Sequence, residues 1–196
     1  MQTNLFHHAL RTIAPAFVLT AVFAFTSVAQ PPPPGSSDPS AAASKGGAAK
    51  VVDFKALIPL LPEPPEGWKA DPAEGSTDDL GDTEITTVHR DYSKGDGDNV
   101  PTTSISILDS AANPEYVEST TAAWNSDTSD AEGYTRAVSV EGMPGFETFE
   151  NDGKHGTLWV MVAKRFFLQI ETTMQDPAAL QEWLKRIDVK KLAAVK

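Results

Sequence analysis

Residues 134–173 read YTRAVSVEGMPGFETFENDGKHGTLWVMVAKRFFLQIETT, and this stretch decides the fold. Four of its segments have strand-like content: residues 134–140, 145–150, 157–164 and 166–173. The connections between them are short and rich in glycine, asparagine and aspartate, which are turn-forming residues. Because short connections join antiparallel neighbours, we expect these segments to form an antiparallel series in one sheet.

The third of these segments is apolar on both of its faces. Leu158, Val160 and Val162 form one face of this segment, and Trp159, Met161 and Ala163 form the other. A strand with two apolar faces is typical of a central strand that is covered on both sides. We therefore expect a layered domain in which helices pack on the sheet.

The residues before this stretch predict further elements. A helix capped by Asp53 and limited by Pro59 is expected near the start of the domain, followed by an exposed acidic loop over residues 71–82. An antiparallel hairpin is expected from strands over 84–92 and 100–108, and a helix begins at Asn113-Pro114-Glu115. A terminal helix follows residues 176–177 with Leu180, Trp183, Leu184 and Ile187 on one face.

This order of elements predicts a single α+β domain over residues 51–196, with an antiparallel sheet flanked by helices. Its length is close to the commonest size for one domain. The chain contains no cysteine, so disulfide bonds do not stabilise this domain and its core must do so.

Several features of the domain together resemble a known family. They are the run Val140-Glu141-Gly142-Met143-Pro144-Gly145-Phe146-Glu147, then Gly156, the strand reaching Arg165-Phe166-Phe167, and Asp176-Pro177 before a helix with Trp183 and Ile187. In these features the chain resembles the Mog1/PsbP-like superfamily, in particular exported bacterial proteins of the DcrB and LpqN type. The resemblance implies an α/β/α sandwich and implies no catalytic residues. The chain differs from those exported relatives because it has no cysteine to carry a lipid.

The first fifty residues predict export. Arg11 precedes an apolar run over residues 12–26 and the small-residue triplet Ser27-Val28-Ala29, which is the pattern of a cleaved signal peptide over residues 1–29. The alternative is an uncleaved anchor, but the run is shorter than the roughly 20 residues that span a membrane. Residues 30–50 form a linker rich in proline, glycine, serine and alanine, which we expect to be disordered. The expected location is the periplasm or the medium.

The charge of the chain limits its partners. The net charge is −11, and removing residues 1–29, which contain Arg11 and no acidic residue, makes it −12. Nucleic acid is therefore not an expected partner, and an acidic chain is repelled by anionic membrane surfaces. The candidates for a local basic patch are Lys164-Arg165, in a tight turn, and the carboxy-terminal cations from Lys185 to Lys196, which are expected to form a solvated helix face.

No sequence motif predicts a catalytic, cofactor or metal site. His89 and His155 are the histidines that remain after cleavage, and each would need a distant carboxylate such as Asp91 or Glu150 to build a site. The run from Asp96 to Asn99 lacks the glycine and glutamate of a calcium loop, so we interpret it as a hairpin turn. A second acidic cluster, formed by Asp78, Asp79 and Asp82, is expected to be a solubilising loop.

The tryptophans are the residues best suited to binding, since their faces stack on ligands and partner side chains. Trp159 and Trp183 fall on apolar faces and are expected in the core. Trp68 and Trp124 are the candidates for a ligand or partner groove.

Three functional hypotheses follow from the sequence. The leading one is an exported, non-enzymatic binding or accessory module of the bacterial cell envelope, whose partner is an unidentified protein or small ligand and whose oligomeric state is open. The alternative is a hydrolase or metal-dependent enzyme with scattered acids and His89 or His155 in its site. The third is an envelope spacer in which the linker over residues 30–50 matters most.

Overall fold

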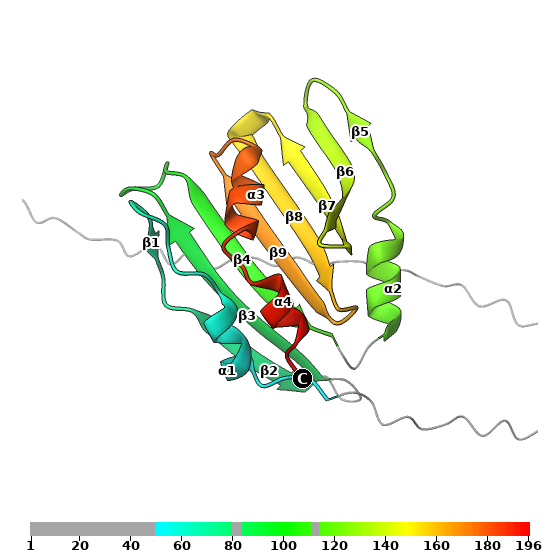
Figure 1. Cartoon of the computed structure of the whole chain (residues 1–196). Helices are drawn as coiled ribbons and strands as arrows, with labels where there is room; N and C mark the ends of the chain where they lie inside the picture. The colour runs from blue at the N-terminus through cyan, green and yellow to red at the C-terminus, as the bar shows by residue number, and fades with distance from the viewer. Residues whose placement is uncertain (1–49, 80–83, 111–113) are drawn as a thin grey trace, which may run out of the picture. The chain divides into compact units, whose positions relative to one another are not determined.

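The computed structural model describes residues 50–79, 84–110 and 114–196 (Figure 1). The predicted signal peptide over residues 1–29 and all of the predicted linker except Lys50 lie outside these ranges, as do Asp82 and Asn113. No helix in the described ranges is long and apolar enough to cross a membrane.

The described residues form one antiparallel sheet with the strand order β1-β3-β4-β9-β8-β7-β6-β5, and β2 also pairs with β3. The strands are β1 (Lys69–Ala70), β2 (Glu74–Asp79), β3 (Glu84–Ser93), β4 (Thr102–Asp109), β5 (Thr128–Ser129), β6 (Gly133–Val140), β7 (Met143–Glu150), β8 (His155–Val162) and β9 (Phe166–Thr173). The β3–β4 hairpin and the series β6–β9 confirm the antiparallel segments predicted from the sequence. Pairing of β4 with β9 joins the two halves and makes β8 a central strand.

The prediction of a loop over residues 71–82 is wrong in part, because Glu74–Asp79 is strand β2. Its composition of glycine, serine and acidic residues disfavours a strand, but its backbone pairs along the whole first half of β3. Gly75 allows this pairing, since a Cβ atom there would lie 2.8 Å from Cγ1 of Val88. The predicted exposure of the segment is confirmed on five of its six residues.

Short helices flank the sheet: α1 (Phe54–Leu57), which continues into a 3-10 turn η1 (Ile58–Leu60), α2 (Pro114–Ala122), α3 (Ala178–Leu184) and α4 (Val189–Ala193), with a second 3-10 turn η2 (Asp152–Lys154). Asp53 caps α1 as predicted, with its carboxylate accepting a hydrogen bond from the Lys55 amide at 2.9 Å. Asp188 caps α4 in the same way, through the Lys191 amide at 2.9 Å.

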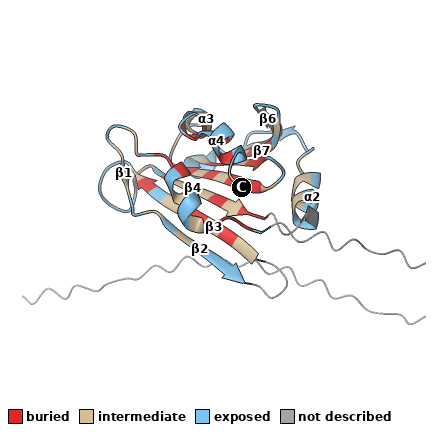
Figure 2. Cartoon of the chain, turned by 60° about the horizontal axis from the view of Figure 1, so that its bottom comes forward, coloured by how far each residue is buried: buried red, intermediate tan, exposed pale blue. Residues whose placement is uncertain are grey.

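The core lies on one face of the sheet, beneath α1, α3 and α4 (Figure 1). We call this the core face; its fully buried residues include Val88, Ile105, Ile107, Leu158, Val160, Leu168 and Ile170 from the strands and Leu57, Leu180 and Leu192 from the helices. In Figure 2, α3 and α4 lie on one side of the sheet and α2 lies at its end. Helical cover on both sides of β8 was expected, and among the described residues α3 and α4 provide it on one side only. The α+β class is confirmed.

An ion pair between Asp109, at the end of β4, and Arg165 anchors the first described residues of the domain. Asp109 is fully buried and accepts two hydrogen bonds from the guanidinium of Arg165, at 2.9 and 2.8 Å. It also accepts one from the Val52 amide at 2.7 Å, and Arg165 donates in turn to the carbonyl of Lys50. This cluster ties the start of the domain to the turn between β8 and β9.

Candidate functional site

The opposite face of the sheet, which we call the open face, is built from the alternate residues of the same strands. Strand register places His89, Ser106, Gln169, Trp159 and Phe146 in one row across β3, β4, β9, β8 and β7. A neighbouring row contains Asp91, Ser104, Glu171, Thr157 and Thr148. Because side chains alternate along a strand, these residues face away from α1, α3 and α4.

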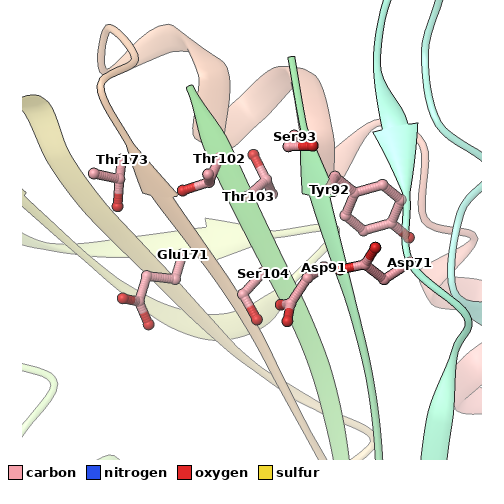
Figure 3. Close-up of a pocket in the computed structure, with 9 residues that line it drawn as sticks. All are labelled: Asp71, Asp91, Tyr92, Ser93, Thr102, Thr103, Ser104, Glu171 and Thr173. Atoms are coloured by element: carbon pink, nitrogen blue, oxygen red, sulfur yellow. The ribbon is translucent and has the colours of Figure 1, made fainter. Parts of the chain in front are cut away.

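The acidic end of the open face contains a depression of about 310 Å³. Its lining residues on the open face are Asp91, Ser93, Thr102, Ser104, Glu171 and Thr173, and it is also lined by Asp71 and by Tyr92 and Thr103, which alternate with them on β3 and β4. Figure 3 shows Asp91, Ser104 and Glu171 next to one another on three adjacent strands, with Asp71 beside Asp91. Three carboxylates and several hydroxyl groups therefore line one shallow site.

No lysine or arginine of the described residues forms an ion pair with Asp71, Asp91 or Glu171. Nε2 of His155 lies 3.7 Å from Oε1 of Glu171, and Nε of Arg90 donates a hydrogen bond to the backbone carbonyl of Asp71 at 2.9 Å. Carboxylates that are not neutralised by their neighbours give the depression a negative potential, so it favours cationic groups over anionic ones.

The two candidate histidines are placed apart on this face. His155 begins β8, and its Nδ1 lies 3.4 Å from the hydroxyl of Thr173. Its carboxylate partner is Glu171; Glu150, one of the two acids considered from the sequence, lies opposite it in strand register. His89 lies on β3 with Nε2 at 3.7 Å from Glu74. The structure thus brings one histidine, and not both, to the acidic depression.

This arrangement is open to water. Asp71 and Asp91 are exposed, and the side chains of His155 and Glu171 are 37% and 42% exposed. Acid–base catalysis gains most from groups that meet in a site from which water is excluded. The geometry at the depression is better suited to binding a polar or charged group than to chemistry on it.

Aromatic side chains occupy the other end of the open face. Trp159 stacks with Phe146 across β8 and β7 at a ring distance of 6.1 Å, and both are half-buried. Trp124, just past α2, contacts Phe167 on β9 at 5.8 Å. A cavity of about 370 Å³ lies between α2 and the sheet, lined by Val117, Glu118, Thr121, Pro144, Met161 and Lys164. The open face therefore changes from acidic to aromatic along its strands.

The two tryptophans proposed for a groove lie on opposite faces of the sheet. Trp124 is on the open face, as its contact with Phe167 shows. Trp68 is half-buried against the core face, where its ring meets Trp183 edge-on at 5.1 Å. They do not line a common groove. Of the two tryptophans expected in the core, Trp183 is buried there, and Trp159 is half-buried on the open face.

The acidic segments considered as cation sites have other surroundings. The run from Asp96 to Asn99 lies in the connection between β3 and β4, where Asp96 pairs with Lys69. The amine of Lys69 lowers the pKa of the Asp96 carboxyl through this hydrogen bond and its charge. Asp78 is on β2 and accepts a hydrogen bond from Ser76 at 2.7 Å. In the described ranges, no three His, Asp or Glu side chains are grouped to hold a metal ion.

A second polar cluster lies on the core face near its edge. Glu147 is fully buried and accepts hydrogen bonds from the Tyr134 hydroxyl at 2.5 Å, from Arg136 at 2.6 Å and from Gln181 at 2.8 Å. Burial and the contact with Glu147 raise the pKa of Tyr134 to about 12. Because every oxygen of this carboxylate has a partner within the protein, the cluster serves the fold.

Sequence reasoning did not single out Asp91, Ser104 and Glu171 as a group. The alternation over residues 100–108 did predict that Ser104 faces away from Ile105, but only the pairing of β4 with β9 brings Glu171 beside it. That pairing places Ser104 opposite Glu171, 67 residues later in the chain, and local spacing contains no signal for it. Comparison of the chain with protein-family models, with curated proteins and with solved structures found no match.

Proposed function

We propose that this protein is a non-enzymatic binding module that holds its partner on the open face of its sheet. One observation carries the proposal: the described helices α1, α3 and α4 bury the core face, whereas the open face combines half-buried aromatic rings with a depression lined by carboxylates. Aromatic surface supplies binding energy and the acids supply selectivity for charge.

The proposed cellular location is based on the first fifty residues of the sequence. The pattern of residues 1–29 supports export to the periplasm or the medium, and residues 30–50 would separate the domain from the cleavage site. The resemblance to the Mog1/PsbP-like superfamily supports the same setting, an accessory protein of the bacterial envelope. In an α/β/α sandwich of that kind the second layer of helices would cover the open face, which in this chain is bordered by α2 alone among the described helices.

Site-specific photo-crosslinking tests the proposal in the host cell. A photoreactive phenylalanine analogue replaces Gln169, in the middle of the open face, and in a matched strain it replaces Glu182, which is exposed on α3 behind the core face. We expect a discrete crosslinked species from position 169 and none from position 182. Equal crosslinking from both positions, or none from position 169, would contradict a binding role for the open face.

A hydrolase is the second candidate, and the contact between His155 and Glu171 favours it. In that role His155 would act as a base next to the carboxylates of the depression. Turnover of a substrate by the purified chain that is lost in His155→Ala and kept in His89→Ala would replace the binding module by this enzyme.

A further inference from the structure

We infer that the partner of the open face is a basic amphipathic helix of another protein, which completes a second helical layer on the sheet. This inference rests on the proposed function and names the chemistry of the occupant. The structure supports it by three features of the open face: its size along the strands, its charge and the position of its aromatic rings.

The core face shows what this sheet accepts as a neighbour. Short helices with an apolar stripe pack there: α3 places Leu180, Trp183 and Leu184 on the sheet, and α4 places Val189 and Leu192. A helix is a common partner for a sheet face that has an apolar strip. The open face has such a strip in Trp159, Phe146 and Phe167. Trp159 and Phe146 lie in one row with Gln169, and Phe167 lies opposite Met161 in the next row.

Charge complementarity selects a basic helix. The carboxylates of Asp71, Asp91 and Glu171 form no ion pair with a lysine or arginine of the described residues, and the whole chain has a net charge of −11. An acidic partner would be repelled, and an uncharged one would remove water from three carboxylates without giving them a counter-charge. Lysine or arginine side chains from the partner supply that charge and make charge-assisted hydrogen bonds.

The distance between the acidic and aromatic groups determines how long the partner helix must be and where its basic residues lie. Glu171 and Phe167 face the same side of β9 and are four residues apart, a distance of about 13 Å in a strand. A helix rises about 1.5 Å per residue, so roughly nine residues cover both groups. We therefore expect lysines or arginines at one end of an apolar stripe with i, i+3 and i+4 spacing.

The test uses the crosslinked species from position 169. After proteolysis, mass spectrometry identifies the partner segment that carries the crosslink, and we expect lysine or arginine residues beside an apolar stripe of helical spacing. A segment from a second copy of this chain, a glycan, or a peptide without basic residues would overturn the inference. The proposed function would survive each of these outcomes, whereas no crosslink from position 169 would end both.

Charge variants supply the second measurement. We expect Asp91→Asn with Glu171→Gln to lower the crosslinking yield from position 169 at least about fivefold, because the counter-charge for the basic residues is lost. The matched control, Glu66→Gln with Glu182→Gln, removes two exposed acids that do not line the depression and should change the yield less than about twofold. Equal losses in both pairs would mean that general attraction to an acidic protein explains the contact, and this would overturn the inference.

Discussion

The core face and the open face are made from alternate residues of the same strands, and they differ in what covers them. On β9, Leu168 and Ile170 are fully buried under the helices, while Gln169 and Glu171 next to them are only half-buried. Because a slip of one residue would exchange the two faces, the register that builds the core also builds the site. The comparison separates residues that stabilise the domain from residues that are free to bind.

The largest difference between the faces is expected for two aspartates. Asp109 is fully buried and paired with Arg165, whereas Asp91 is exposed on the open face. We expect Asp109→Ala to lower the free energy of unfolding by about 3–5 kcal/mol, because it leaves a partly buried guanidinium without its counter-charge. Asp91→Ala should change it by less than about 0.5 kcal/mol. Urea denaturation measures both, and similar losses would show that Asp91 also supports the fold.

Leu168 and Gln169 are neighbours on β9, and substituting each of them compares the stability contributions of the two faces without a change of charge. Leu168→Ala should cost about 2–5 kcal/mol of unfolding free energy, since it removes a fully buried side chain and leaves a cavity. Gln169→Ala, one residue later on the open face, should cost less than about 0.5 kcal/mol. If Gln169→Ala were as costly as Leu168→Ala, the open face would be part of the core.

The sequence predicts the strands of both faces because their chemistry alternates over short distances. Ile105 and Ile107 alternate with Ser104 and Ser106 on β4, and this period of two is visible without any tertiary information. Strand β2 was missed because acidic and small residues disfavour a strand by themselves, and only the backbone of β3 gives them hydrogen-bonding partners.

The acidic depression could not be predicted from the local sequence either, because distant segments form it. Asp91 and Glu171 are eighty residues apart in the chain, and β4 brings them within two strands of one another. The surroundings of Trp68 depend on a distant segment in the same way, because Trp183 of α3 packs against its ring on the core face. Contacts between distant segments decide both placements.

Tyr92, on the core face, gives a prediction of how the stability of the domain depends on pH. The Tyr92 hydroxyl donates a hydrogen bond to the Pro62 carbonyl at 2.7 Å, and burial raises the pKa of Tyr92 to about 12. In the unfolded chain the value is near 10, so the folded state keeps its proton longer, and stability should fall as the pH rises from about 10 to about 12. The expected cost of Tyr92→Phe at neutral pH is about 1 kcal/mol.

The pH dependence distinguishes this tyrosine from a merely packed ring. Unfolding free energies of Tyr92→Phe should fall less steeply than those of the original chain between pH 10 and 12, while Tyr134, whose pKa is also raised to about 12, keeps part of the slope. Urea titrations at several pH values measure this. Identical slopes for the two proteins would show that Tyr92 ionises in the folded state as it does in the unfolded one.

The smallest effect concerns the turn that sets the register of β8 against β9. Ala163 and Lys164 both have φ angles of +54°, a backbone region that glycine adopts without the strain of a side chain. Lys164→Gly should therefore raise the unfolding free energy by about 0.5 kcal/mol, the relief of strain less the added entropy of glycine in the unfolded chain. Lys94→Gly, at an exposed lysine whose φ is negative, should instead lower it slightly. Destabilisation by both substitutions would mean that the turn is not strained, and that the pairing of the strands alone keeps the two faces in register.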